Sequence, residues 1–179
     1  MAGFLNSRRS SSLLRMSTLV VALGAFVATT ADASATTVVA LGASQTYGKG
    51  VARGKDFPAQ LEILLKAKGL AVHVINAGIN GDTTAHMAAR LDRVLRPDTK
   101  VVILQPGGND ARKGQGDRRE GNLTSIRQTL QSRGIKVVMV PNSMFHSLPR
   151  SADQQHLTPE GYHQLASELV SEVASALQH

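Results

Sequence analysis

A serine, a histidine and an aspartate are placed where they could carry out nucleophilic catalysis. Ser44 lies in the glycine-rich stretch Gly42-Ala43-Ser44, and Asp153 precedes His156 by three residues. A serine hydroxyl is a poor nucleophile at neutral pH and needs an adjacent base to take its proton. His156 can be that base, and a carboxylate within one turn can hold its ring in the correct tautomer. These residues predict a Ser44–His156–Asp153 triad for acyl transfer.

Acyl transfer also needs donors for the oxyanion that forms when a carbonyl is attacked. The candidates are the backbone N–H of Ser44, the backbone N–H of Gly81 and the side-chain amide of Asn109. Gly81 precedes Asp82, which we expect to cap a helix, and negative charge is favoured near a helix N-terminus. A glycine there also allows a substrate to approach the backbone closely. We therefore expect an oxyanion hole formed by Ser44, Gly81 and Asn109.

Four short apolar runs alternate with four segments of helical spacing. The runs at 37–41, 71–76, 100–105 and 135–140 are bounded by Gly or Pro, which is typical of strands buried on both faces. The alternation predicts a three-layer α/β/α domain with a flavodoxin-like parallel sheet of four to five strands. The expected apolar helix faces are Phe57, Leu61, Leu64 and Leu65; Ala85, Ala88, Leu91 and Leu95; Leu123, Ile126 and Leu130; and Tyr162, Leu165, Leu169 and Val173.

The candidate residues follow the expected strands or precede the last helix. Ser44 follows the first strand, Gly81 the second and Asn109 the third, and all should meet at the carboxyl edge of the sheet, where such folds bind ligands. Taken singly, each residue has an ordinary structural explanation: Ser, Gly, Asn and Asp favour turns. His156 could mark a helix start, and Asp153 could be a solvated charge. Their coincidence at one edge favours catalysis.

These segments resemble the conserved blocks of the SGNH (GDSL-type) hydrolases, in particular the small bacterial thioesterase, lysophospholipase and arylesterase branch. The matching blocks are Gly42-Ala43-Ser44, Asn80-Gly81-Asp82-Thr83, Gly107-Gly108-Asn109-Asp110 and the Asp153–His156 pair, in order over nearly the whole chain after residue 35. The resemblance implies the SGNH fold and a carboxylic ester hydrolase that cleaves a lysophospholipid, a thioester or an aryl ester. Ala43 stands where the family has an acidic residue outside the triad, so we expect altered local hydrogen bonding without loss of activity.

Two other functions stay open at this point: an exported polysaccharide O-deacetylase, and a non-catalytic binding protein on a hydrolase scaffold.

We expect no cofactor and no metal. The chain has no cysteine, and its six histidines show no spacing such as H-E-x-x-H. The glycines near Ser44 do not fit a nucleotide-binding loop, because Gly50 follows Lys49 where Ser or Thr is needed.

The first 35 residues have the pattern of a cleaved signal peptide. Three arginines precede an apolar run at 19–28, and Ala33-Ser34-Ala35 is a small-x-small cleavage signature. The run is too short for a comfortable membrane span. We therefore expect a signal peptide at 1–35 and a hydrolase domain at 36–179, exported to the periplasm or secreted, without a stable membrane anchor after cleavage.

The positive charge of the chain does not indicate nucleic-acid binding. The formal net charge is +7, and removing the three arginines and one aspartate of residues 1–35 leaves +5. The basic residues are scattered and form no basic helix or aromatic-interleaved strand, so we expect no nucleic-acid partner. The oligomeric state is left open.

Two segments near the expected site allow two interpretations each. Met144, Phe145 and Leu148 could line an acyl pocket or only pack their loop onto the domain. The basic loop from Ala111 to Gly121 could be a flap that favours anionic substrates, or a solvated mobile loop.

Overall fold

The computed structural model describes residues 1, 3 and 35–178, and residues 35–178 belong to one compact unit. The expected signal peptide at 1–35 lies, except for residues 1, 3 and 35, outside the described residues. Among the described residues, no helix has both the length and the hydropathy needed to cross a membrane.

Four parallel strands form the centre of the domain. They are β1 (Thr36–Gly42), β2 (Val72–Gly78), β3 (Thr99–Gln105) and β4 (Lys136–Met139), in the spatial order β2-β1-β3-β4. All three neighbouring pairs are parallel. The predicted parallel sheet is confirmed, with four strands. Because β1 lies between β2 and β3, the strand order reverses beside β1, and its carboxyl end is where a ligand crevice forms in such sheets.

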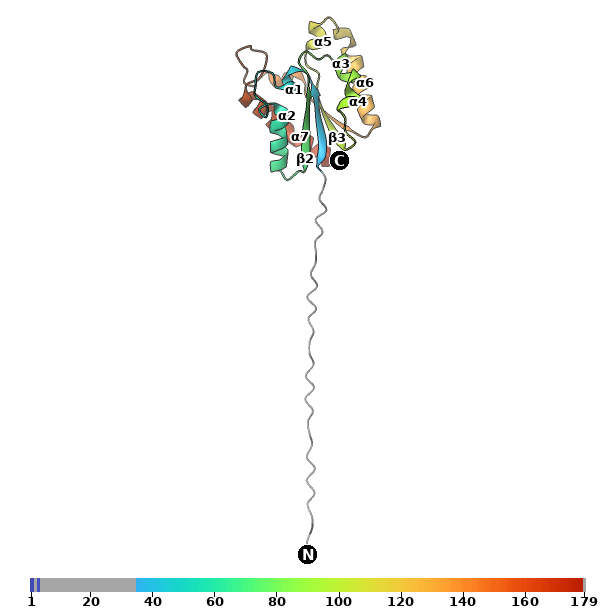
Figure 1. Cartoon of the computed structure of the whole chain (residues 1–179), viewed down its shortest axis with the longest axis vertical. Helices are drawn as coiled ribbons and strands as arrows, with labels where there is room; N and C mark the ends of the chain where they lie inside the picture. Colours follow the sequence, from blue (N-terminus) through green and yellow to red (C-terminus); the bar gives the residue numbers. More distant parts are fainter. Residues whose placement is uncertain (2, 4–34, 179) are drawn as a thin grey trace. The chain divides into compact units, whose positions relative to one another are not determined.

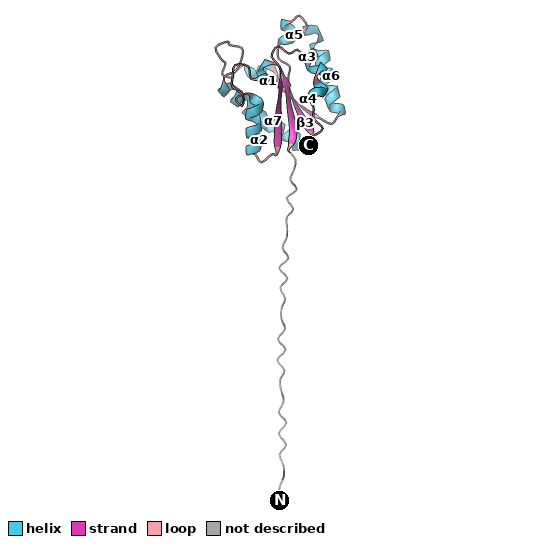
Figure 2. Cartoon of the chain, viewed as in Figure 1, coloured by secondary structure: helices cyan, strands magenta, loops and turns pink. Residues whose placement is uncertain are grey.

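Helices cover both faces of this sheet (Figures 1 and 2). On one face, α2 (Phe57–Ala67) and α7 (Pro159–Gln178) pack against Val38, Ala40 and their neighbours. On the other, α3 (Thr84–Ala89), α4 (Leu91–Val94) and α6 (Arg119–Ser132) pack against Val39 and Leu41. Successive strand residues point to opposite faces, so β1 needs the continuous apolar run that its sequence has. The three-layer α/β/α architecture is confirmed.

The start of the last helix also follows the sequence signals. Pro159 is the first residue of α7, and the Thr158 hydroxyl accepts a hydrogen bond from the Gly161 N–H at 3.2 Å. Side-chain capping of this kind satisfies an N–H that has no partner inside the helix.

The second expected helix differs from its prediction. It is divided into α3 and α4 at Arg90, and the side chain that caps α3 is Thr83, whose hydroxyl accepts from the His86 N–H. The expectation that Asp82 caps this helix was wrong. Its carboxylate is instead paired with Arg90, at 2.7 Å from Nη2.

The basic segment from Ala111 to Gly121 is not an extended loop. It contains the end of α5 (Asn109–Arg112), the 3₁₀ turn η1 (Gly116–Arg118) and the start of α6 at Arg119. The expected apolar face starts at Leu123, whereas α6 begins four residues earlier, at Arg119.

Candidate active site

Ser44 is the first residue of the short helix α1 (Ser44–Tyr47), directly after β1. The Oε1 of Gln105, at the end of β3, accepts hydrogen bonds from the Ala43 N–H at 3.3 Å and from the Thr46 hydroxyl at 3.2 Å. The close approach of α1 to β2 requires a glycine at position 78, because a Cβ there would lie 2.1 Å from the Tyr47 nitrogen. The turn that contains Ser44 therefore lies against the carboxyl ends of β1, β2 and β3.

The structure brings Ser44, His156 and Asp153 together. The Nε2 of His156 lies 3.0 Å from the Ser44 Oγ, and its Nδ1 lies 2.5 Å from the Asp153 Oδ2. His156 is only 2% exposed, whereas half of the Asp153 side chain is open to solvent. The imidazole thus bridges a hydroxyl and a carboxylate, which is the arrangement that acyl-transfer triads use.

A tight turn before α7 places Asp153 against His156. The Asp153 Oδ1 accepts the N–H of Gln155 at 2.9 Å and that of His156 at 2.8 Å. Ser151 donates its hydroxyl to the same oxygen at 2.8 Å. Gln154 has φ of 55°, the left-handed region, which closes the turn.

The electrostatics of Asp153 follow from these contacts. Its pKa lies well below the ordinary value of an aspartate, first because the His156 ring hydrogen-bonds the carboxylate. The backbone N–H groups of His156 and Gln155 and the Ser151 hydroxyl lower this pKa further. The carboxylate therefore stays ionised wherever the imidazole can act as a base.

Gln45 connects the Ser44 turn to the His156 turn. Its Nε2 donates to the Gln155 carbonyl at 2.7 Å, and its Oε1 accepts the hydroxyl of Tyr162 from α7 at 3.0 Å. Burial raises the pKa of Tyr162, so this hydroxyl stays a donor. Gln45 thereby holds the Ser44 turn, the His156 turn and α7 together.

The expected oxyanion donors lie in neighbouring segments. Within the part of the chain that the structure describes, the Ser44 and Gly81 N–H groups donate no hydrogen bond. Gly81 has φ of 76°, which explains the glycine. The Asn109 Nδ2 donates to the Asp82 carbonyl at 2.7 Å, which ties Asn109 to the segment that holds Gly81. This bond uses one of the two amide hydrogens, and the other donates no hydrogen bond within the described chain.

Arg90, which the sequence analysis did not single out, holds the segment that contains Gly81 and Asp82 in place. It pairs with Asp82 and donates to the carbonyls of Gly42 at 3.2 Å and Ala77 at 2.7 Å. Both charged side chains are less than 10% exposed, at 8% for Arg90 and 5% for Asp82. One buried cation thus joins the ends of β1 and β2 to the Gly81 segment.

Two basic residues, the last residue of α5 and the one after it, donate hydrogen bonds to Asn109 and Gly81. The Arg112 Nη2 donates to the Asn109 Oδ1 at 2.7 Å, and the Lys113 Nζ donates to the Gly81 carbonyl at 2.8 Å. Because the Asn109 Oδ1 accepts a hydrogen bond and the Nδ2 donates one, the orientation of the amide is defined by its partners. Part of the basic segment therefore contributes to the site as a fixed support.

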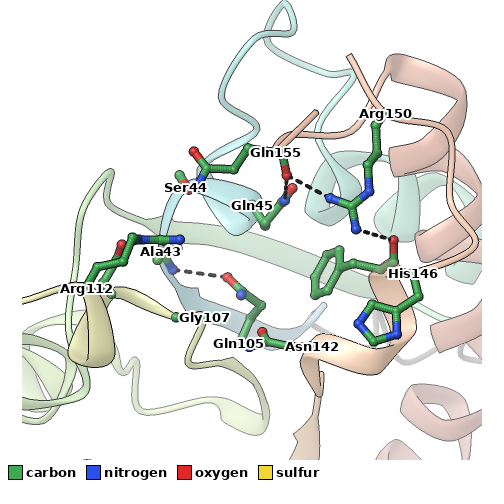
Figure 3. Close-up of a pocket in the computed structure, with 13 residues that line it drawn as sticks. Ala43, Ser44, Gln45, Gln105, Gly107, Arg112, Asn142, His146, Arg150 and Gln155 are labelled. Atoms are coloured by element: carbon green, nitrogen blue, oxygen red, sulfur yellow. Dashed lines mark hydrogen bonds between the residues drawn. The ribbon is translucent and has the colours of Figure 1, made fainter. Parts of the chain in front are cut away.

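A pocket of about 220 Å³ opens beside Ser44 and Asn109 (Figure 3). Phe145 lines it, but it is also 5% exposed and packed in the core with Leu148. Met144 packs against the same core and does not line the pocket. Of the three apolar residues considered for an acyl pocket, only Phe145 is placed to contact a substrate. Gly81 and His156 are not among the lining residues, although His156 contacts Ser44, which is.

No cluster of three or more His, Cys, Asp or Glu side chains suited to a metal ion occurs among residues 35–178. Near Ser44, the Asp153 carboxylate is bonded to His156, Asp82 is paired with Arg90, and Asp110 accepts from Thr84.

The chain is similar to known proteins in both sequence and fold. The sequence model of the GDSL-like Lipase/Acylhydrolase family matches residues 40–178. The chain is 32% identical over 118 residues to "Esterase TesA" of Pseudomonas aeruginosa, a match that covers 65% of this chain and 59% of that protein. It is 30% identical to the "Arylesterase" of Vibrio mimicus over 74% of this chain and 73% of that one. Among solved structures, the SGNH-hydrolase family esterase AlinE4 aligns with a TM-score of 0.56 and 28% identity, covering 79% of this chain and 73% of that one.

Proposed function

The chain belongs to the GDSL-like lipase/acylhydrolase family, and on that basis we propose that it is a carboxylic ester hydrolase with Ser44 as its nucleophile. The observation that carries the proposal is the continuous contact from the Ser44 Oγ through the His156 ring to the Asp153 carboxylate, at 3.0 and 2.5 Å. The chain spans only 59% of the length of the Pseudomonas relative.

In the first half of the reaction, His156 takes the Ser44 proton as the Oγ attacks the ester carbonyl. The carbonyl oxygen becomes an oxyanion, which accepts hydrogen bonds from the N–H groups of Ser44 and Gly81 and from the second amide hydrogen of Asn109. His156 then gives its proton to the departing alcohol, and the acyl group stays on Ser44. In the second half, water loses a proton to His156 and attacks the carbonyl of the acyl-serine. The bond between this carbonyl carbon and the Ser44 Oγ then breaks, His156 returns the proton to the Ser44 Oγ, and the acid is released.

Asp153 supports both halves of this cycle without exchanging a proton. Its depressed pKa means that it remains a carboxylate when His156 becomes positively charged. The ion pair stabilises the imidazolium and keeps Nε2 directed at Ser44.

For substrates, we propose acyl esters, with lysophospholipids, thioesters and aryl esters as the groups to examine. The names of two similar proteins, an esterase and an arylesterase, support ester substrates. The pocket also favours short groups, because its volume of about 220 Å³ is below the 300–1,000 Å³ usual for drug-sized ligands.

We propose further that the protein acts outside the cytoplasm. A signal peptide ending at Ala35 would leave Thr36, the first residue of β1, as the new N-terminus, so cleavage there removes no residue of the sheet.

Turnover of p-nitrophenyl esters from acetate to palmitate tests the proposed function. We expect hydrolysis without added metal, highest for short acyl chains. Deacetylation of acetylated xylan without hydrolysis of the other esters would indicate the polysaccharide deacetylase instead. A folded protein that hydrolyses no ester would contradict the proposal and favour the binding protein.

A further inference from the structure

Two arginines line the pocket beside Ser44, and no acidic residue does. Arg112 reaches it from the end of α5, and Arg150 from the segment after the 3₁₀ turn η2 (Asn142–Phe145). Figure 3 shows them toward opposite ends of the residues drawn, with Ser44 between them. None of the thirteen lining residues is Asp or Glu. Because arginine stays protonated at any physiological pH, the pocket wall has permanent positive charge.

Arg150 is held in place by uncharged acceptors. Its Nη2 donates to the Phe145 carbonyl at 2.8 Å, and its Nη1 lies 3.2 Å from the Gln155 carbonyl and 3.3 Å from the Gln154 carbonyl. These carbonyls satisfy its hydrogen bonds without neutralising its charge. The cation is thus fixed in position before a ligand arrives.

Arg112 is similarly uncompensated. Its hydrogen bond goes to the Asn109 amide oxygen, and neither Arg112 nor Arg150 belongs to an ion pair within the described chain. The carboxylates nearest in sequence are engaged elsewhere. Asp153 pairs with His156, and the fully buried Asp110 accepts the N–H and hydroxyl of Thr84.

We propose that this site selects esters that carry a second, anionic group, a carboxylate or a phosphate, a few bonds from the scissile carbonyl. Guanidinium groups bind such anions through charge-assisted and often paired hydrogen bonds, which are roughly twice as strong as neutral ones. The proposal rests on the proposed esterase function and specifies its substrate class.

The anionic group can belong to the acyl part or to the alcohol part, and two substrate pairs distinguish them. For the acyl part, mono-p-nitrophenyl glutarate is compared with neutral p-nitrophenyl pentanoate. For the alcohol part, 4-acetoxybenzoate is compared with its neutral methyl ester. The rate of hydrolysis without enzyme in the same buffer is subtracted for each ester. Differences in intrinsic reactivity then cancel when a variant is compared with the wild type on the same two esters.

The measured quantity is the ratio of kcat/KM for the anionic ester to that for its neutral partner. We expect a ratio of about 10 or more for one pair, as one charge-assisted hydrogen bond provides. Arg112→Gln or Arg150→Gln should lower that ratio at least about fivefold, and about 0.5 M salt should lower it in the wild type. The ratio is the right measure because loss of the Arg112–Asn109 contact would slow both esters alike.

Arg118→Gln is the matched control, because this exposed arginine lies six residues from Arg112 and does not line the pocket. Its ratio should equal that of the wild type. If Arg150→Gln does not fold, Arg112→Gln decides. Ratios near 1 for both pairs, or an equal loss in Arg118→Gln, would overturn the proposal while leaving the esterase function intact. Absence of hydrolysis of all four esters would instead contradict the esterase function itself.

Discussion

The side-chain amide of Asn109 donates to the backbone carbonyl of Asp82, at 2.7 Å. This contact gives Asn109 two separate roles. It fixes the segment that contains Gly81, and it leaves one amide hydrogen for an oxyanion. The two roles predict different consequences when the side chain is removed.

Asn109→Ala should lower kcat by about 10²–10³ with little change in KM, because the lost hydrogen bond to the oxyanion forms mainly in the transition state. It should also lower the free energy of unfolding by about 1–3 kcal/mol, since the buried Asp82 carbonyl loses its partner. The measurements are steady-state kinetics with a neutral ester and urea unfolding of the same preparation.

Asn122→Ala is the matched control for this variant. Its amide also donates to another residue, the Thr84 hydroxyl at 3.0 Å, but it does not line the pocket. Its kcat should stay normal. A fall in kcat of less than about fivefold for Asn109→Ala, far below the usual cost of losing such a donor, would exclude Asn109 from the oxyanion hole.

The buried pair of Asp82 and Arg90 should be important for stability. Arg90→Ala removes the cation beside the buried Asp82 carboxylate and one hydrogen-bond donor from each of two carbonyls, so the free energy of unfolding should fall by about 3–5 kcal/mol. Urea unfolding measures this loss. The exposed pair of Arg133 and Asp92, at 2.6 Å, serves for comparison, and Arg133→Ala should cost no more than about 1 kcal/mol. Equal costs for the two variants would show that the buried pair has no special role.

On the acid side of the pH profile, kcat/KM should fall with the binding of a single proton. His156 must be neutral to act as a base, so activity falls as the imidazole is protonated. Asp153 has a lowered pKa in the folded protein, so it remains ionised throughout that fall and loses its charge only at much lower pH. The logarithm of kcat/KM plotted against pH should therefore have a limiting slope of 1. A slope of 2 would mean that a carboxylate titrates in the same range.

The exported protein should begin at Thr36. Intact-mass measurement of the protein recovered from the periplasm or the culture medium tests this expectation. An Ala33→Leu variant, which removes a small residue of the cleavage signature, should remain uncut. Recovery of the whole chain with Met1 from the cytosol alone would contradict export.

The sequence was most informative about features that depend on local pattern. Every strand was located to within two residues, because strands buried on both faces are continuous apolar runs. The meeting of Ser44 with His156 followed from the common edge of a parallel sheet. The buried face of α7, formed by Tyr162, Leu165 and their neighbours, followed from helical spacing.

The supports of the site were not predictable in the same way. Arg90 contacts the backbone carbonyls at the ends of two strands and the Asp82 carboxylate. These groups come together only in the folded chain, so no local sequence pattern indicates the role of Arg90. Gln105 ends a buried strand, and its polar side chain in an apolar run was the available signal. Helix α5 has only four residues, too few for a periodic pattern, so the position of Arg112 beside Asn109 had no local signature.

The most direct test of the account is ester hydrolysis by Ser44→Ala. The Ser44 hydroxyl contacts His156 and contributes nothing to the core, so the variant should unfold at the temperature of the wild type. Its kcat for p-nitrophenyl acetate should fall by about 10⁴–10⁶, the cost of losing a triad nucleophile. Ser167→Ala, which removes a hydroxyl bonded to the His163 carbonyl on α7, should leave kcat unchanged. Turnover near the wild-type rate in Ser44→Ala would show that another group is the nucleophile and would contradict the account.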